Sequence, residues 1–114
     1  MITRVVEVKT KPGKAKELCR KLHEEVLHIL QSHHGFVDEI VLISDHDADQ
    51  VIAVSFWNSR ADAEHFHHAH YAHISDLIKH LAHTTPKVHM YAVETSTVHH
   101  VAKGKALEPE AAIF

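Results

Sequence analysis

Residues 51–81, VIAVSFWNSRADAEHFHHAHYAHISDLIKHL, contain the signals that decide the fold. The first seven residues are nearly all strong β-formers and predict a buried strand that ends at Trp57. The chain then breaks at Asn58 and continues as a helix to about Ala82, with Ser59 as a suitable N-cap and Asp62 as an acid in the first turn. Five histidines fall within nine residues of this helix. The stretch therefore predicts a strand followed by a capped helix that carries the candidate chemistry.

The rest of the chain supplies three more strands and one more helix. β-branched and apolar residues predict strands over residues 2–9, 36–44 and 88–98. A regular apolar stripe predicts a helix over residues 15–32. Pro12 suits the first turn of the first helix, and Gly35 is expected to cap its end in the left-handed conformation. The predicted order is βαββαβ, which is an α+β, ferredoxin-like fold with a four-stranded antiparallel sheet.

Length and composition bound the class of protein. The chain has 114 residues and a net charge of −3, so it has room for one core and offers no basic surface to nucleic acid. A single cysteine, Cys19, excludes an intramolecular disulfide and fits the cytoplasm. No apolar run approaches the roughly 20 residues of a membrane span, so we expect no membrane partner. We predict one domain over residues 1–98 and a C-terminal tail over residues 99–114 that docks on a partner subunit.

The predicted sheet is apolar on both faces, although helices cover only one of them. The apolar residues of the third strand divide into Ile52, Val54 and Phe56 on one side and Val51, Ala53 and Trp57 on the other. In an antiparallel sheet with one solvent-exposed face, apolar and polar residues should instead alternate along each strand. Because apolar patches of this size are rarely left in water, we predict a homodimer in which two sheets pack face to face.

One histidine of the second helix differs from the others. A helical wheel places His65, His68 and His83 on the polar side and His67, His73 and His80 at its borders. His70 lies in the middle of the apolar stripe, where a leucine would be expected. It is either a buried residue with satisfied ring nitrogens, a catalytic acid–base group in a pocket, or one ligand of a metal. The third alternative lacks a metalloprotease motif and a clear third ligand, so we expect no metal.

Four aromatic residues are candidate substrate contacts. Trp57 ends the third strand, Phe66 and Tyr71 lie on the second helix, and Tyr91 lies on the fourth strand. Each of them could equally serve as a core or interface residue. No phosphate-binding loop, dinucleotide fingerprint or CxxC pair is present, so we expect no cofactor.

Several short motifs carry a family resemblance over about residues 2–98. They are Lys11-Pro12-Gly13, Gly35-Phe36, Ser55-Phe56-Trp57-Asn58-Ser59 followed by Ala61, Ala63, His67 and Tyr71, and the block 87–94, KVHMYAVE. Together they resemble the antibiotic biosynthesis monooxygenase domain family, whose members are small dimeric α/β barrels. The family includes cofactor-independent oxygenases of aromatic molecules, haem-degrading enzymes and members with no known reaction.

The resemblance implies a cofactor-independent monooxygenase that acts on a small aromatic or quinone-like molecule. Its pocket would lie between the sheet and the second helix, with Trp57 as a wall and His70 as base or hydrogen-bond donor. The quinone-forming members have an asparagine where this chain has Ala53, and the haem-degrading members have asparagine, tryptophan and histidine where it has Val6, Phe66 and Asp76. The alternatives are a non-catalytic domain that binds a small ligand or only dimerises and, more weakly, a haem-binding protein.

Overall fold

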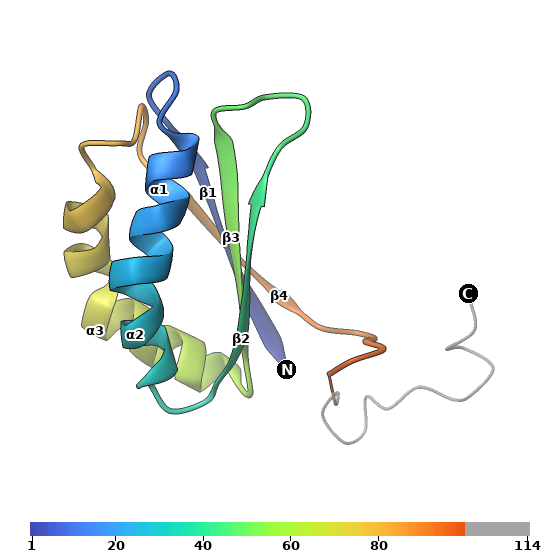
Figure 1. Cartoon of the computed structure of the whole chain (residues 1–114). Coiled ribbons are helices and arrows are strands. Elements are labelled where there is room, and N and C mark those ends of the chain that lie inside the picture. The colour runs from blue at the N-terminus through green and yellow to red at the C-terminus, as the bar shows by residue number, and fades with distance from the viewer. Residues whose placement is uncertain (100–114) are drawn as a thin grey trace.

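Four strands pair into one antiparallel sheet in the order β2-β3-β1-β4, as Figure 1 shows. The structure, a computed structural model, describes residues 1–99, so most of the predicted tail lies outside the described residues. The elements are β1 (Ile2–Lys9), α1 (Ala15–Lys21), η1 (Leu22–Val26), α2 (Leu27–Gln31), β2 (Phe36–Ile43), β3 (Gln50–Trp57), α3 (Arg60–Ile78) and β4 (Lys87–Ala92). This order and pairing confirm the predicted ferredoxin-like fold.

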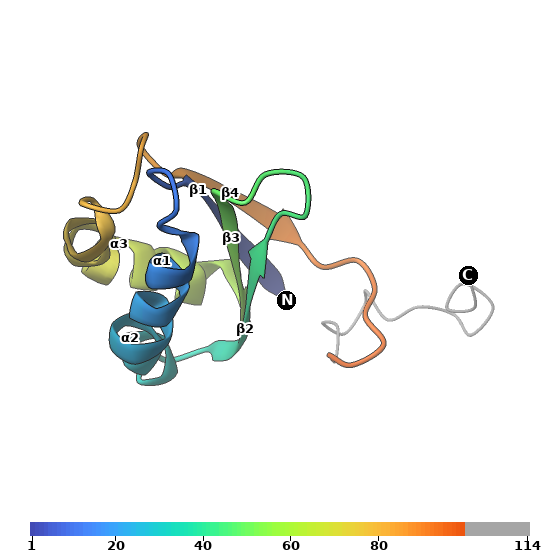
Figure 2. The ribbon, with the colours of Figure 1, turned by 45° about the horizontal axis from the view of Figure 1, so that its top comes forward.

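The helices of residues 1–99 all lie on one face of the sheet (Figures 1 and 2). Among these residues no helix or strand covers the opposite face, where His99 packs on the ring of Phe56 (4.7 Å between ring centres). The strand register determines which side chains meet the helices. Arg4 of β1 stands opposite Ser55 of β3, which in turn stands opposite Glu39 of β2. Because residues directly opposite each other on neighbouring strands point to the same face of a sheet, these three residues share one face, which is the helix-covered one.

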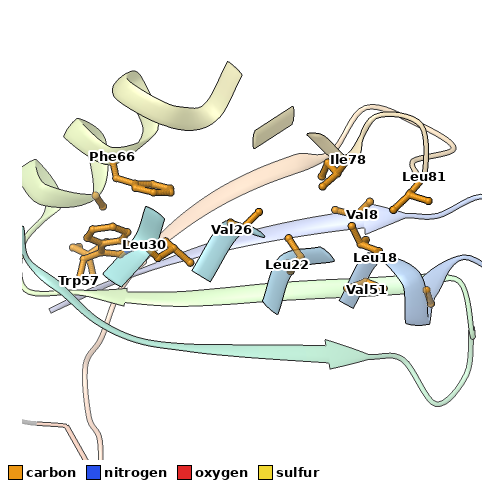
Figure 3. Packing of buried hydrophobic residues seen from close by; sticks show 13 residues of the cluster. Val8, Leu18, Leu22, Val26, Leu30, Val51, Trp57, Phe66, Ile78 and Leu81 are labelled. Atoms are coloured by element: carbon orange, nitrogen blue, oxygen red, sulfur yellow. The ribbon is translucent and has the colours of Figure 1, made fainter. Parts of the chain in front are cut away.

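The core forms where the first helical segment and α3 pack on the sheet. Leu18, Leu22, Val26 and Leu30 follow one another along this segment and are all buried. Figure 3 shows Leu18 beside Val51 at one end of the core and Leu30 close to Trp57 at the other. Their spacing of four residues would drift by about 40° per step on a regular α-helix. The π-helical turn η1 in the middle of the segment has more residues per turn, so it keeps the four side chains directed at the sheet.

The two helices and the closing strand differ most from the sequence prediction. The first helix, predicted as regular over residues 15–32, contains the π-helical turn and ends at Gln31. The second helix ends at Ile78, and single turns follow in which the Leu81 N–H donates to the Ile78 carbonyl (2.9 Å). The closing strand was predicted to reach residue 98 but ends at Ala92, because Ala92 already pairs with Ile2, the first residue of β1.

Gly35 lies directly against the N-terminus of α3. Its φ of 84° is left-handed, and a Cβ atom at this position would lie 2.1 Å from Oδ2 of Asp62. Asp62 belongs to the predicted cap: its N–H donates to Ser59 Oγ (3.2 Å), and the Ser59 hydroxyl donates to the Asp62 carboxylate (3.0 Å). Any side chain at residue 35 would therefore push the cap apart.

We expect Gly35→Ala to lower the free energy of unfolding by about 2–3 kcal/mol, from left-handed strain of about 1–2 kcal/mol and a lost cap of about 1 kcal/mol. Gly13→Ala is a matched control, because Gly13 has a φ of 76° but open space around its Cβ position. Urea denaturation of both variants separates the two contributions, since only Gly35→Ala should lose the cap. Equal losses would show that Asp62 moves aside without cost.

Candidate functional site

A narrow cavity of about 50 Å³ lies between the helix-covered face of the sheet and the helices. Most of its wall is aliphatic and comes from β1, β3, the first helical segment and α3. The π-helical turn contributes Leu22 and Val26 to this wall. Its polar lining residues are Arg4, Glu39, Ser55, Tyr71 and Ser75. A few polar groups in an apolar hollow are the usual composition of a small-molecule site.

Arg4 is the main polar feature of the cavity. Only 6% of its surface is exposed, and its Nε atom has no hydrogen-bond partner. Its Nη2 group donates to Nδ1 of His67 at 3.2 Å, which requires the neutral form of that histidine. Burial and the charge of Arg4 both lower the pKa of His67, so the neutral form is favoured.

The guanidinium of Arg4 also lies against two aromatic rings of α3. Its carbon is 5.5 Å from the ring centre of Phe66 and 5.5 Å from that of Tyr71. Tyr71 in turn stacks on His67, with ring centres 4.5 Å apart and an angle of 18° between the planes. Burial lowers the pKa of Arg4, but a guanidinium stays charged in proteins. The site therefore holds a fixed positive charge between aromatic faces.

Glu39 faces the same cavity from β2. Its pKa is raised to about 7, first by burial and then by the neighbouring Asp38, while the positive charge of Arg4 acts in the opposite direction. Both protonation states of this carboxyl are therefore populated near neutral pH. A carboxyl group with such a pKa can accept a proton from a ligand and return it.

The aromatic residues that the sequence singled out are distributed unevenly. Phe66 and Tyr71 line the cavity. Trp57 does not: it is fully buried beside Phe66 (5.0 Å between ring centres), and its Nε1–H donates to Ser55 Oγ (2.9 Å). Tyr91 is 56% exposed and pairs with Thr3, so alternation along β4 places it on the uncovered face of the sheet.

His70 is half-buried and lies beside the cavity rather than in its lining. Its ring contacts Phe66 (5.4 Å between centres) and His33 (5.5 Å), and Phe66 stands in the cavity wall. The catalytic role of His70 stays a prediction. His67, which the helical wheel placed at a border, makes the contact with Arg4 instead.

The sequence did not single out Arg4 or Glu39, although a signal was present for both. Arg4 lies two residues from Ile2 and Val6 in a strand of alternating pattern, which places its side chain inward. Glu39 lies two residues before Val41, and a register shift between Phe36 and Asp38 precedes it. A charged residue at an inward strand position was the available indication of a polar cavity.

Histidines do not gather into a metal centre in the part of the chain that the structure describes. Within residues 1–99, no group of three or more histidine, cysteine, aspartate or glutamate side chains could hold a metal ion. Several histidines instead lie near single carboxylates, as His89 does beside Glu7 (3.0 Å) on the uncovered face. Among the same residues, no helix is both long and apolar enough to cross a membrane.

The fold and the cavity define a ferredoxin-like α+β protein with a small pocket between its sheet and its helices. The family model described as antibiotic biosynthesis monooxygenase matches residues 1–77, and the chain belongs to this family. No curated protein shows significant similarity to the chain.

Solved structures with the same fold include a monooxygenase from the gene ActVA-Orf6 of Streptomyces coelicolor in complex with nanaomycin D (TM-score 0.74, 16% identity, covering 87% of this chain and 92% of that one). A protein of unknown function from Nitrosomonas europaea has a TM-score of 0.72 and 13% identity, covering 87% of this chain and 94% of that one. A conserved protein from Methanosarcina mazei has a TM-score of 0.61 and 22% identity, covering 80% of this chain and 91% of that one. At these identities the likeness concerns the fold alone.

Proposed function

We propose that this protein is a monooxygenase that oxidises a small hydroxy-aromatic molecule in the cavity without a metal or an organic cofactor. The observation that carries the proposal is the buried guanidinium of Arg4, whose Nε has no partner and which lies in the wall of an otherwise apolar cavity. An aromatic ring suits the aliphatic walls, and the oxygen of its hydroxyl group suits Arg4. Membership of the monooxygenase family supports the reaction class.

The reaction balances without an external reductant. A phenol reacts with dioxygen to give a quinone and water, so the substrate supplies all the electrons: one oxygen atom enters the ring and the other leaves as water. The phenol first transfers its hydroxyl proton to Glu39, whose pKa of about 7 suits this exchange. Arg4 stabilises the phenolate, which is the form that donates electrons to dioxygen.

The size of the cavity limits the substrate. A dry cavity of about 150 Å³ binds benzene in another protein, and this cavity of about 50 Å³ is smaller, so a ring enters only if side chains move. A second, open groove of about 360 Å³ is lined by residues that include His67, Val88 and Met90. Because His67 also contacts Arg4, its displacement would join the groove to the cavity. The substrate would thus enter past His67, and a single ring fits best.

Oxygen uptake tests the proposal. We expect single-ring phenols to consume one dioxygen per quinone formed, and hydroquinones one dioxygen per hydroxyquinone formed. Their fully methylated ethers should consume none, because such an ether has no proton for Glu39 and forms no anion for Arg4. An oxygen electrode and the quinone absorbance measure the two quantities. Ligand binding without any oxygen uptake would contradict the monooxygenase and leave a non-catalytic, ligand-binding domain.

Two variants distinguish the candidate proton acceptors in the same assay. His70→Ala tests the base that the sequence predicts, and Glu39→Gln tests the carboxyl in the cavity wall. We expect the Glu39 variant to lose more activity, because His70 is not among the residues that line the cavity. A larger loss in His70→Ala would assign the base to His70.

A second copy of the chain is the partner that suits the uncovered face of the sheet. Ile40 and Leu42 on this face remain 44% and 46% exposed. The helices of the described residues 1–99 all lie on the other face (Figures 1 and 2). A homodimer through this face would bury them, and the predicted docking of the tail on the partner belongs to the same proposal. With one cysteine in the chain, the cytoplasm is the expected location.

A further inference from the structure

We infer that the cavity is a proton-coupled site for monoanions with a flat, apolar body: the anion binds beside Arg4, and Glu39 takes up one proton when it does. The inference rests on the proposed function in that both use this cavity, but it concerns binding and requires no turnover. It follows from the arrangement of Arg4, Glu39 and the groups around them.

Arg4 lacks a counterion. Within residues 1–99, no carboxylate oxygen lies within 4.0 Å of a guanidinium nitrogen of Arg4, which is the limit for an ion pair. The one side-chain hydrogen bond of Arg4 goes to a neutral histidine, His67. A buried charge is costly unless an opposite charge accompanies it. The Nε of Arg4 is buried and has no hydrogen-bond partner, so it is a donor that an incoming anion reaches once the side chains around this small cavity move.

Glu39 lines the same cavity as Arg4 and lies two strands away on the same face of the sheet. Ser55 stands between them in the sheet, so their Cα atoms are two strand spacings, or about 10 Å, apart. The charged groups that act on Glu39 are Asp38 on its own strand and Arg4 from β1. Tyr71 on α3 is the other titratable side chain that lines the cavity, and it acts on Arg4. The first helical segment presents only leucine and valine side chains to the cavity.

An anion beside Arg4 changes the electrostatics of Glu39 in one direction. In the free site, burial raises the pKa of Glu39 and the positive charge of Arg4 lowers it, and the result is a pKa of about 7. A bound anion neutralises this charge and adds its own negative field, so the carboxyl gains affinity for a proton. Near pH 8 the free site holds an ionised Glu39 and the occupied site a protonated one, and binding takes up a proton from solution.

The walls of the cavity also select the class of anion. Arg4 is the one lysine or arginine in its lining, so a dianion would leave a second charge buried without a cation. The remaining wall is mostly aliphatic and favours an apolar body. An aryl carboxylate or a phenolate fits these requirements, whereas inorganic phosphate does not.

Titration calorimetry with benzoate at pH 8, in two buffers of different ionisation enthalpy, tests the inference. We expect uptake of nearly one proton per benzoate bound and, between pH 7 and pH 9, a Kd that rises towards tenfold per pH unit. Glu39→Gln should bind benzoate with no proton uptake and with a Kd that does not depend on pH. Benzamide, a neutral molecule of the same shape, should bind the wild type without proton uptake.

His67→Asn is the decisive comparison, because His67 is the other titratable group in contact with Arg4. Asparagine keeps an acceptor near the position of Nδ1 but does not titrate, so proton uptake should persist in this variant. Proton uptake that is lost in His67→Asn and kept in Glu39→Gln would overturn the inference, as would benzoate binding without proton uptake or no binding at all. Proton-coupled binding without oxygen consumption by any phenol would contradict the proposed function and leave this inference intact.

Discussion

Arg4→Met should lower kcat/KM for a phenolic substrate by about 10²- to 10³-fold, which is the usual cost of removing one donor that stabilises an oxyanion. The same substitution should leave the free energy of unfolding unchanged or raise it. The buried guanidinium of Arg4 carries a charge, and its Nε has no hydrogen-bond partner, so burying it costs free energy. An apolar side chain of similar length removes this desolvation cost. Steady-state kinetics and urea denaturation measure the two effects on one preparation.

Opposite changes in activity and stability would identify Arg4 as a functional residue, because a purely structural residue loses both together. Arg20→Met is the matched control: Arg20 is an exposed residue of α1, and neither quantity should change. A variant that unfolds several kcal/mol more easily, with activity reduced only in proportion to the unfolded fraction, would show that Arg4 holds the fold together instead.

The order of the elements could be predicted because each signal is local. The Ser59–Asp62 cap, the apolar spacing of residues 15–32 and the β-rich run before Trp57 depend on a few neighbouring residues, and all three agree with the structure. Boundaries were less predictable because they depend on pairing. β4 ends where β1 begins, and no pattern within residues 88–98 contains that information.

The candidate site depends on contacts between distant segments, which a sequence pattern does not record. Arg4 and His67 meet across 63 positions of the chain, and the strand pattern alone does not show that α3 covers Arg4. The helical wheel correctly turns His70 away from the polar side of α3. It cannot distinguish a cavity wall from the packed region behind it, and His70 lies in the latter beside Phe66.

Ile40→Lys should convert a wild-type dimer into a monomer at micromolar concentrations. Ile40 lies on the uncovered face beside Val54, its partner on β3, and 44% of its surface is exposed in the single chain. In a symmetric dimer the change removes the burial of the exposed 44% of two Ile40 side chains, at about 0.7–1.3 kcal/mol each, so the dissociation constant should rise by about 10- to 10²-fold from this loss alone. The two lysine charges placed in the interface raise it further. Sedimentation velocity over a range of concentrations measures this shift.

The control places the same charge on the other side of the molecule. Ala72 is exposed on α3, so Ala72→Lys should leave the dimer intact. Circular dichroism should show that both variants keep the fold, because neither position belongs to the buried core. A wild-type chain that sediments as a monomer, or an Ile40→Lys variant that still dimerises, would mean that another surface or partner covers this face. The apolar residues on this face of the sheet would then need a different explanation, because apolar patches of this size are rarely left exposed to water.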